Sequence, residues 1–383
     1  MTLESTRPGP ELPAPGLELP APGPELPAPA PASEPGRLDW DALVAGNQRA
    51  TYLQTTAWGV VKRPNGWEPV IRESRSGPAA IGAQFLLRQP RAMPWVFAYA
   101  PRGPIADPWT REGLVRWAGE LRERPWPGDR RVSHLRIEPE IEADGSDLHR
   151  DVLVWLRRAG FRAAPAIQPT TTRIVDLRDT EEALWSDLRK KWRQYVNKAR
   201  AAGVAVMDVD GDRLPEFHEI MTETAARTGT RIRALSAYQD VWRAFRPSGN
   251  ARLLFACGND GRPQAALFLV RCGTRVVEPY GGMTAAGAAS RANYLLKWEA
   301  IRTSRDVGCT SYDMWGLVNP GIARFKAGFG GREVHTIGAW DLDVRPVGAA
   351  IYRLGEAVAR RRRARRNRSA PGVEGSPTDG DAE

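Results

Sequence analysis

The segment from Tyr312 to Gly331 reads YDMWGLVNPGIARFKAGFGG, and it holds a single lysine, Lys326, close to a group of glycines. Glycines allow the backbone to turn tightly or to approach a ligand closely. A lysine ammonium in this apolar setting can place one positive charge beside a reacting carbonyl group. The alternative is a surface loop with a solvated lysine, and this segment alone does not decide between the two.

A second segment of interest, Glu278-Pro279-Tyr280-Gly281-Gly282, lies at the end of an expected strand. Its glycines permit a ligand to approach closely, and the acid and the tyrosine can position an amine. The plainer interpretation is a strand end that packs its tyrosine.

Two further pairs combine an aromatic residue with a cation. Tyr99 and Arg102 leave an expected strand in the sequence YAPRGP, and a guanidinium suits bidentate capture of phosphate or carboxylate. Trp58 and Lys62 are four residues apart, so on a helix they share one face. Each pair is either a phosphate site or ordinary packing with a solvated cation.

Residues 180–203 predict one amphipathic helix, with a capping box from Asp179 to Glu182 and a stop at Gly203. Six cations and no glutamate lie between Leu188 and Gly203. Cations on this face can grip the phosphates of a nucleic acid, with affinity that depends on salt. A solvated charged face is the alternative. The cations considered for phosphate contact are Lys191, Arg193 and Lys198.

Strands alternate with helices along the chain, which predicts an α/β fold. Each half has a hairpin, a strand with a tyrosine, a helix, a further strand and a Gly-Phe pair, so we expect a duplicated domain. The expected strands are 68–73, 79–87, 94–100, 133–137, 172–177, 252–257, 264–272, 275–280, 310–315 and 334–344. The expected helices are 110–123, 147–159, 180–203, 214–228, 236–245 and 291–306.

Composition limits the possible functions. An ELPAP motif recurs every seven residues from Glu11, which predicts an extended, disordered tether over 1–36. The net charge of +10 suggests an anionic partner such as a nucleic acid, a phosphorylated small molecule or a membrane surface. The alternative is that the arginine-rich composition reflects genome base composition. Three scattered cysteines and four histidines form no metal-ligand pattern, so we expect no metal.

The chain lacks several familiar motifs. It contains no GxGxxG after a strand, no GxxxxGK[ST] and no GxSxG. The [QR]-x-x-G-x-[GA] loop that holds the coenzyme A pyrophosphate in acetyltransferases is missing where it would be expected. No signal peptide or membrane-spanning run is present, so we expect a cytosolic protein. We expect no cofactor.

The ordered motifs of the chain resemble the Fem-type (FemABX) peptidyltransferases, which use aminoacyl-tRNA to build the interpeptide bridges of peptidoglycan. The resemblance covers 53–342 and implies tandem GNAT-like acyltransferase domains with mixed central sheets flanked by helices. The matching pieces are LQTTAWGVVK, YAPRGP, LRIEP, QPTTTRIVDL, KWRQYVNKARAAGV, YGG, NYLLKWEAIR, YDMWG, GIARFKAGFGG and IGAWDL. We expect domains at 37–178 and 179–346, the second opening with the basic helix.

The resemblance implies roles for particular residues. Phe325 and Lys326 fall at the position tied to the aminoacyl-tRNA end and the transfer step. This chain has Glu278 where some members carry a second tyrosine, and Asn197 where many carry arginine. It also lacks a long helical hairpin between the halves, as in the shorter members. The residues implied to line the acceptor pocket are Lys62, Tyr99, Arg193, Asn197 and Tyr280.

The chemistry implied is aminolysis of an aminoacyl ester by the side-chain amine of a lipid-linked muropeptide. Such a reaction needs positioning, a neutral amine and stabilisation of an oxyanion. Lys326 is the expected oxyanion partner, and Glu278 and Asp313 are candidate bases, although substrate groups can also serve. One rival is a GNAT-fold acyltransferase with another donor or acceptor. A second rival is a non-catalytic RNA- or membrane-binding adaptor.

The C-terminal part, 347–383, predicts a basic segment followed by a disordered acidic tail. Seven of the nine residues from Arg360 to Arg368 are arginines, and Val347, Ile351 and Leu354 form a short apolar stripe before them. Arginines near an anionic inner leaflet each add about 1 kcal/mol of binding. Peripheral membrane contact, nucleic-acid contact and a plain basic tail are the three interpretations of this segment.

Overall fold

The structure is a computed structural model that describes residues 39–76, 79–90, 93–229, 232–317 and 319–355. Every element below lies within the unit that begins at Trp40. The expected tether over 1–36 and the run Arg360–Arg368 lie outside the described residues.

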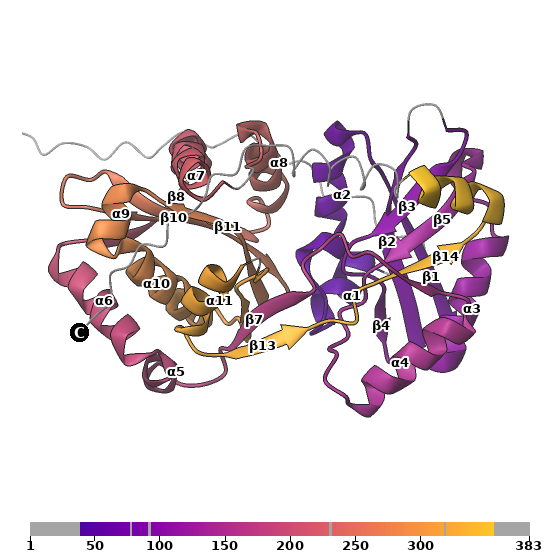
Figure 1. Cartoon of the computed structure of the whole chain (residues 1–383), viewed down its shortest axis with the longest axis horizontal. Helices are drawn as coiled ribbons and strands as arrows, with labels where there is room; N and C mark the ends of the chain where they lie inside the picture. The colour runs from indigo at the N-terminus through magenta and orange to yellow at the C-terminus, as the bar shows by residue number, and fades with distance from the viewer. Residues whose placement is uncertain (1–38, 77–78, 91–92, 230–231, 318, 356–383) are drawn as a thin grey trace, which may run out of the picture. The chain divides into compact units, whose positions relative to one another are not determined.

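This unit contains two mixed sheets flanked by helices (Figure 1), which confirms the expected fold class. The first sheet has the strand order β1-β2-β3-β5-β14-β6, with β4 paired to β2. It comprises β1 (Glu68–Ser76), β2 (Ala79–Arg88), β3 (Val96–Ala100), β4 (Ile105–Asp107), β5 (Val132–Ile137), β6 (Arg162–Ala164) and β14 (Ala339–Asp343).

The second sheet has the order β13-β7-β12-β11-β10-β9-β8. It comprises β7 (Thr171–Asp176), β8 (Ala205–Val209), β9 (Ala251–Cys257), β10 (Pro263–Cys272), β11 (Arg275–Met283), β12 (Ser311–Asp313) and β13 (Arg332–His335). β11 and β12 run parallel to each other, whereas the other pairs of neighbouring strands in this sheet are antiparallel.

The helices cover the sheets and join their strands. They are α1 (Trp40–Gly46), α2 (Thr56–Lys62), α3 (Arg111–Glu123), α4 (Asp147–Arg158), α5 (Glu181–Asp187), α6 (Lys190–Ala201), α7 (Leu214–Thr228), α8 (Leu235–Phe245), α9 (Ala285–Ser290), α10 (Ala292–Asp306) and α11 (Pro320–Ala327). Residues 346–355 are also helical. Short 3-10 turns cover Tyr52–Gln54, Arg63–Asn65, Pro127–Asp129 and Gly211–Arg213.

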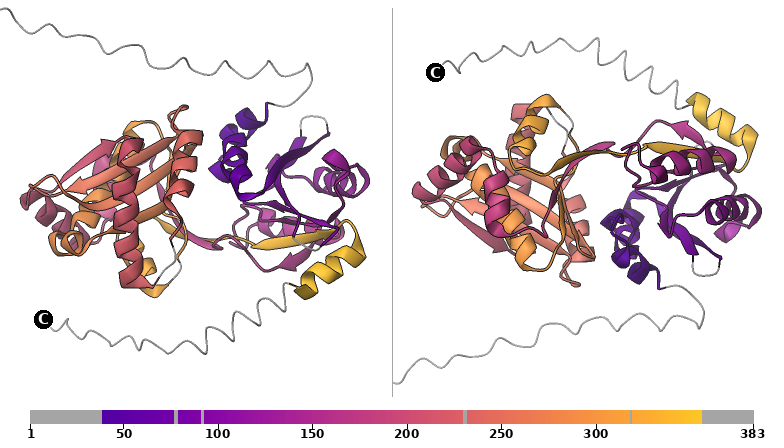
Figure 2. Two further views of the ribbon diagram at one scale, coloured as in Figure 1. Left: turned by 90° about the horizontal axis from the view of Figure 1, so that it is seen from above. Right: turned by 90° about the horizontal axis from the view of Figure 1, so that it is seen from below.

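The two sheets exchange strands. β7 precedes the expected boundary at residue 178, yet it pairs with β12 and β13 in the second sheet. β14 comes from the end of the second half and pairs with β5 and β6 in the first sheet. The single strand expected over 334–344 is therefore wrong, because a turn with Gly338 at φ +74° separates β13 from β14. Figure 2 shows β7 and β13 running together as the links between the sheets.

The basic helix expected over 180–203 is also corrected. It is two helices, α5 and α6, separated by Leu188 and Arg189 in extended conformation. The break buries Leu188, and the Arg189 N–H donates to the Gly328 carbonyl at 2.9 Å. The N-cap is Thr180 rather than Asp179. The break therefore ties the basic helix to the segment that follows Lys326.

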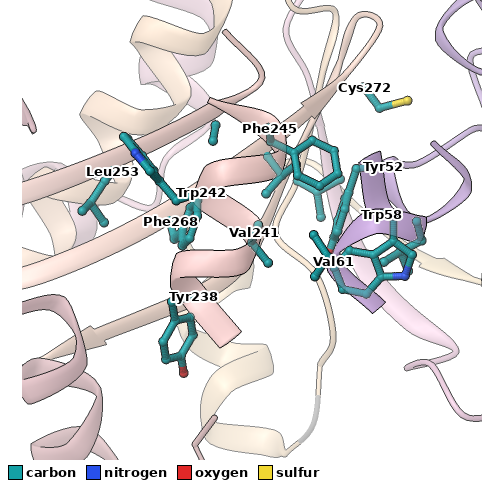
Figure 3. Packing of buried hydrophobic residues seen from close by; sticks show 14 of the residues in the cluster. Tyr52, Trp58, Val61, Tyr238, Val241, Trp242, Phe245, Leu253, Phe268 and Cys272 are labelled. Atoms are coloured by element: carbon teal, nitrogen blue, oxygen red, sulfur yellow. The ribbon is translucent and has the colours of Figure 1, made fainter. Parts of the chain in front are cut away.

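A shared apolar core joins the first half of the unit to the second. Figure 3 shows Tyr52 and Trp58 from the first half beside Phe245 of α8. The Tyr52 ring lies edge-on to Trp58 at 5.3 Å and to Phe245 at 5.8 Å, measured between ring centroids. Aromatic pairs of this geometry add stability beyond their buried area.

Buried ion pairs also cross between the halves. Glu140 accepts from Arg102 and, at 3.1 Å, from Arg275, while Arg275 also bonds Asp313 at 2.5 Å. Arg102, Arg275 and Asp313 are almost fully buried. Removing one member would leave an uncompensated charge in the interior, which is strongly destabilising. The chain Arg102–Glu140–Arg275–Asp313 therefore fixes the end of β12, from which the Lys326 segment departs.

Candidate functional site

Lys326 lies on a short helix, α11, where the sequence had suggested a loop. The Asn319 side chain caps this helix by accepting from the Ile322 N–H at 2.8 Å, and a proline occupies the first turn. Asparagine at the cap followed by proline is a typical helix start. This signal was present in the sequence, and it would have placed Lys326 in the last helical turn.

The Lys326 ammonium is held by three backbone carbonyls. Nζ donates to Met314 O at 2.6 Å, Trp315 O at 3.1 Å and Gly316 O at 2.9 Å. These bonds engage all three ammonium hydrogens. Burial, and then the charge of Lys297, lower the pKa of Lys326 to about 8. Lys326 therefore closes the turn after β12 while keeping a buried positive charge.

Asp313 supports the same turn from the other side. Its carboxylate accepts from the Trp315 N–H at 2.8 Å, from Thr172 at 2.5 Å and from Arg275. Burial alone would raise its pKa, but Arg275 and these hydrogen bonds hold the pKa below its usual range. Trp315 has φ +60°, a strained value for a non-glycine residue. The surroundings of Asp313 thus suit a fixed structural carboxylate better than a proton acceptor.

Glu278 occupies a bulge in β11. Glu278 and Pro279 together oppose one residue of β10, Leu269, in the strand register, and proline at this point loses no ladder hydrogen bond. The Glu278 carboxylate accepts from Lys297 Nζ at both oxygens and from the Tyr312 hydroxyl at 2.6 Å. Glu278 is therefore a buried, fully engaged carboxylate, and not one that faces a substrate freely.

Lys297 was not anticipated by sequence reasoning. It is 2% exposed on α10, and it lies among buried apolar neighbours such as Leu296 and Trp298. A lysine in the middle of an apolar helix face is the signal that could have revealed it, because buried lysines require a partner.

A cavity of about 220 Å³ lies beside this cluster. Lys62 and Arg233 supply its positive charge, and no aspartate or glutamate is found among the described residues of its lining. The lining residues are Tyr52, Leu53, Trp58, Lys62, Trp67, Leu86, Tyr99, Pro101, Ile167, Gln168, Arg233, Pro279, Tyr280 and Trp315. The sequence TGTRIRA around Arg233 is compatible with either a phosphate site or a plain basic loop.

Two donors in this cavity, Lys62 Nζ and Trp58 Nε1, have no hydrogen-bond acceptor in the part of the chain that the structure describes. Lys62 Nζ lies 4.4 Å from the Trp58 ring centroid, and burial, followed by the charge of Arg233, lowers the Lys62 pKa to about 8. The Trp58 indole Nε1 is buried and has no hydrogen-bond partner among the described residues. Two cations without a carboxylate, together with an unpaired N–H, favour an anionic ligand.

The cavity and the Lys326 turn are neighbours. The Trp315 side chain lines the cavity, while its carbonyl oxygen accepts from Lys326. Tyr280 also lines the cavity, two residues after Glu278. A ligand held by Lys62 and Arg233 can therefore reach the region of the buried charges.

The structure brings together three of the predicted substrate-binding residues, Lys62, Tyr99 and Tyr280. The Tyr99 hydroxyl donates to Glu138 at 2.5 Å and accepts from Gln168 at 3.0 Å. Tyr280 is buried, and burial raises the pKa of its hydroxyl. Burial also raises the pKa of Tyr99, so both phenols stay neutral at physiological pH. The Tyr280 hydroxyl can donate a hydrogen bond to a ligand, whereas the Tyr99 hydrogen is engaged by Glu138.

The other predicted substrate-binding residues do not line the cavity. Arg102 is buried in its ion pair with Glu140, and Arg193 donates to backbone carbonyls at the end of α5. Asn197 is exposed on α6. The Phe325 ring packs against Tyr294 and Phe329 at 5.3 and 5.2 Å. Their roles in binding stay predictions.

The glycines near these residues serve packing. A Cβ added to Gly328 would lie 2.3 Å from the Trp192 indole, and one added to Gly281 would lie 2.4 Å from Leu267. Trp192 also donates from Nε1 to the Phe325 carbonyl at 3.0 Å. These glycines therefore admit neighbouring side chains and hold α6 against α11.

Among the described residues, no group of three or more His, Cys, Asp or Glu side chains is arranged to hold a metal ion. In the same part of the chain, no helix combines the length and the apolar character needed to cross a membrane. The three cysteines are unpaired and buried.

Comparison with known proteins shows which sequences the chain resembles. Residues 186–327 match the family described as Acetyltransferase (GNAT) domain. A lipid II:glycine glycyltransferase of Staphylococcus aureus (strain MRSA252) is 26% identical over 219 residues, which cover 56% of this chain and 52% of that protein. These matches agree with the resemblance to FemABX proteins that the sequence motifs indicate.

A solved structure supports the fold of the chain. The crystal structure of FemX matches with a TM-score of 0.74 and 19% identity, and the match covers 82% of this chain and 97% of that chain. The tandem GNAT-like architecture is therefore confirmed. The chain spans about half the length of the curated relatives that it matches.

Proposed function

We propose that this protein transfers an amino acid from an aminoacyl-tRNA to the side-chain amine of a lipid-linked peptidoglycan precursor. The observation that carries the proposal is the cavity with Lys62 and Arg233, whose described lining holds no carboxylate and which adjoins the Lys326 turn. The name of the relative, lipid II:glycine glycyltransferase, supports the same class of acceptor.

The cavity would hold the diphosphate of the acceptor. Desolvated cations are costly unless an anion neutralises them, and charge-assisted bonds to phosphate are strong. Lys62 and Arg233 supply the charge, and the unpaired Trp58 indole N–H supplies a further donor. The aromatic lining accommodates the attached sugar by stacking.

The transfer step is aminolysis of an activated ester. The neutral amine attacks the ester carbonyl, the new C–N bond forms, and the C–O bond to the tRNA ribose breaks. The leaving ribose oxygen takes up the proton that the amine releases, so the step needs no further reactant. Because Glu278 and Asp313 are both engaged in buried bonds, we assign proton transfer to the substrate groups.

Lys326 acts through its charge and its position. Its hydrogens hold the carbonyls of residues 314–316, and its positive charge stabilises the tetrahedral oxyanion across the turn. Preorganised charges of this kind typically contribute about 3–4 kcal/mol to a transition state. A direct hydrogen bond from Lys326 to the oxyanion would require Lys326 to release one of its three carbonyl partners.

The proposed reaction takes place in the cytoplasm, at the inner face of the membrane that carries the acceptor. The decisive experiment incubates the full chain with a pool of charged tRNAs and a lipid-linked precursor, followed by mass measurement of the precursor. We expect a mass increase of whole aminoacyl residues that requires charged tRNA. A mass increase that requires only an acyl-CoA would overturn the proposal.

A mass increase that requires only an acyl-CoA would favour the rival acyltransferase. The match of residues 186–327 to an acetyltransferase domain is compatible with that rival.

The adaptor interpretation predicts a different result. It would be favoured if Lys326→Ala and Tyr280→Phe left cellular function complete while deletion of Arg360–Arg368 abolished it.

A further inference from the structure

The helix over 346–355 has two different faces. On its inner face the Tyr352 ring lies 5.1 Å from Phe97 and 4.5 Å from His134, and Ala349 is fully buried. Arg353 donates to Asp343 at 2.7 Å. These contacts fix the helix against the first sheet (yellow in Figure 2).

The outer face of this helix is apolar and exposed. Val347 is 70% exposed, Ile351 43% and Leu354 68%. A spacing of four and then three residues places them on one side of the helix. The remaining exposed large hydrophobic residues among those described lie singly on other segments. The three residues therefore form a stripe that the described part of the fold leaves uncovered.

The sequence around the stripe is strongly basic. Arg345 precedes it and is exposed, and the run Arg360–Arg368 follows it with seven arginines. From Arg345 to Arg368 the only acid is Glu356. An apolar helix face combined with concentrated positive charge is the pattern of a segment that lies on an anionic lipid surface.

The helix is also close to the proposed acceptor cavity. Phe97 stacks on Tyr352 and, at 6.2 Å, on Tyr99, and it lies 6.5 Å from Trp67. Tyr99 and Trp67 line the cavity. One aromatic ring thus separates the helix from the residues that would hold the diphosphate of a lipid-linked substrate.

We propose that Val347, Ile351 and Leu354 form a docking surface for an anionic lipid bilayer. The three side chains enter the interface between headgroups and acyl chains, and the basic composition of the surrounding sequence favours an anionic lipid over a neutral one. The inference goes beyond the proposed function, because docking requires neither tRNA nor precursor. It can therefore fail or succeed independently of the transfer reaction.

The test is co-sedimentation of the full chain with vesicles of phosphatidylglycerol and phosphatidylcholine, or of phosphatidylcholine alone. The variant Val347→Ser/Leu354→Ser removes the stripe without touching the inner face. Val154→Ser, on α4 and 42% exposed, is the matched control. We expect the double variant to bind the anionic vesicles at least about tenfold more weakly than the wild type, in line with the loss of two buried apolar side chains.

The control should bind like the wild type, and all three proteins should melt at similar temperatures. Equal vesicle binding by the wild type and the double variant would overturn the proposal. Sedimentation velocity gives a second decisive outcome. If the double variant converts a wild-type dimer into a monomer, the stripe is an interface between copies of the chain, and the bilayer proposal is wrong.

Discussion

Lys62 and Lys326 both have a lowered pKa, but their side chains have different surroundings. Burial is the main cause that lowers the pKa of each to about 8. Lys326 donates to three backbone carbonyls within one turn. Lys62 instead lies over the Trp58 ring and faces a cavity that it shares with Arg233.

The difference separates Lys326, whose hydrogen bonds stabilise the fold, from Lys62, which is placed to bind a ligand. A buried donor with internal acceptors stabilises the structure around it, whereas a buried cation without an anion costs free energy until one binds. The same pKa shift therefore does not identify a function. The hydrogen-bond partners distinguish the two lysines, and our proposal gives the Lys326 turn a role in the transfer step and the Lys62 cavity a role in binding.

The largest expected effect concerns the support of the Lys326 turn. Asp313→Ala should lower the free energy of unfolding by about 3–5 kcal/mol, because the buried Arg275 loses one of its two carboxylates and keeps Glu140, which it shares with Arg102. Urea denaturation measures this loss. The control Asp176→Ala removes a partner of the exposed Arg178 and should cost at most about 1 kcal/mol. Similar losses for both variants would show that the turn is not held by buried charge.

Lys326→Met should reduce kcat by about 10²–10³-fold, because the charge beside the developing oxyanion is lost. The KM for the precursor should change little. Steady-state kinetics of precursor-dependent deacylation of charged tRNA provide the measurement, with exposed Lys190→Met as the control. A Lys326→Met enzyme that keeps its kcat would remove this lysine from the transfer step.

The Lys62 cavity should respond to pH. Below pH 8 the Lys62 ammonium is present and attracts the diphosphate, and above pH 8 the free protein loses this charge. The Kd of the precursor should therefore rise by up to about tenfold per pH unit above 8. Calorimetric titrations between pH 6.5 and 9.5 measure the slope. Lys62→Met should lack it, and a wild-type Kd that is independent of pH would contradict the assignment.

The smallest effect is expected at Asn197, which is exposed on α6 and outside the cavity. Asn197→Ala should change precursor affinity by about twofold or less, as is usual for exposed positions. A loss of tenfold or more, with an unchanged melting temperature, would extend the acceptor site onto α6.

Local signals in the sequence predicted many elements well. The hairpin expected at 252–257 and 264–272 is confirmed as β9 and β10, and the helix expected at 214–228 is α7. Alternation and turn residues decide such elements locally. The exchange of β7 and β14 was missed because a strand pattern does not name the sheet that the strand joins.

The site was predicted in part. The resemblance to the family suggested Lys62, Tyr99 and Tyr280, which share the cavity. The pair Glu278–Lys297 joins residues from β11 and α10, and no local pattern predicts such a contact. The three carbonyl partners of Lys326 were equally hidden, because they depend on the left-handed Trp315 and on the packing of α11.

Equilibrium binding of the lipid-linked precursor to Lys62→Met and Lys326→Met tests the division of labour most directly. The account predicts that Lys62→Met weakens binding by about 10–100-fold, as expected for the loss of a charge-assisted bond to phosphate. It predicts that Lys326→Met binds like the wild type while failing to complete the transfer. Equal weakening by both variants, or weakening by Lys326→Met alone, would contradict it.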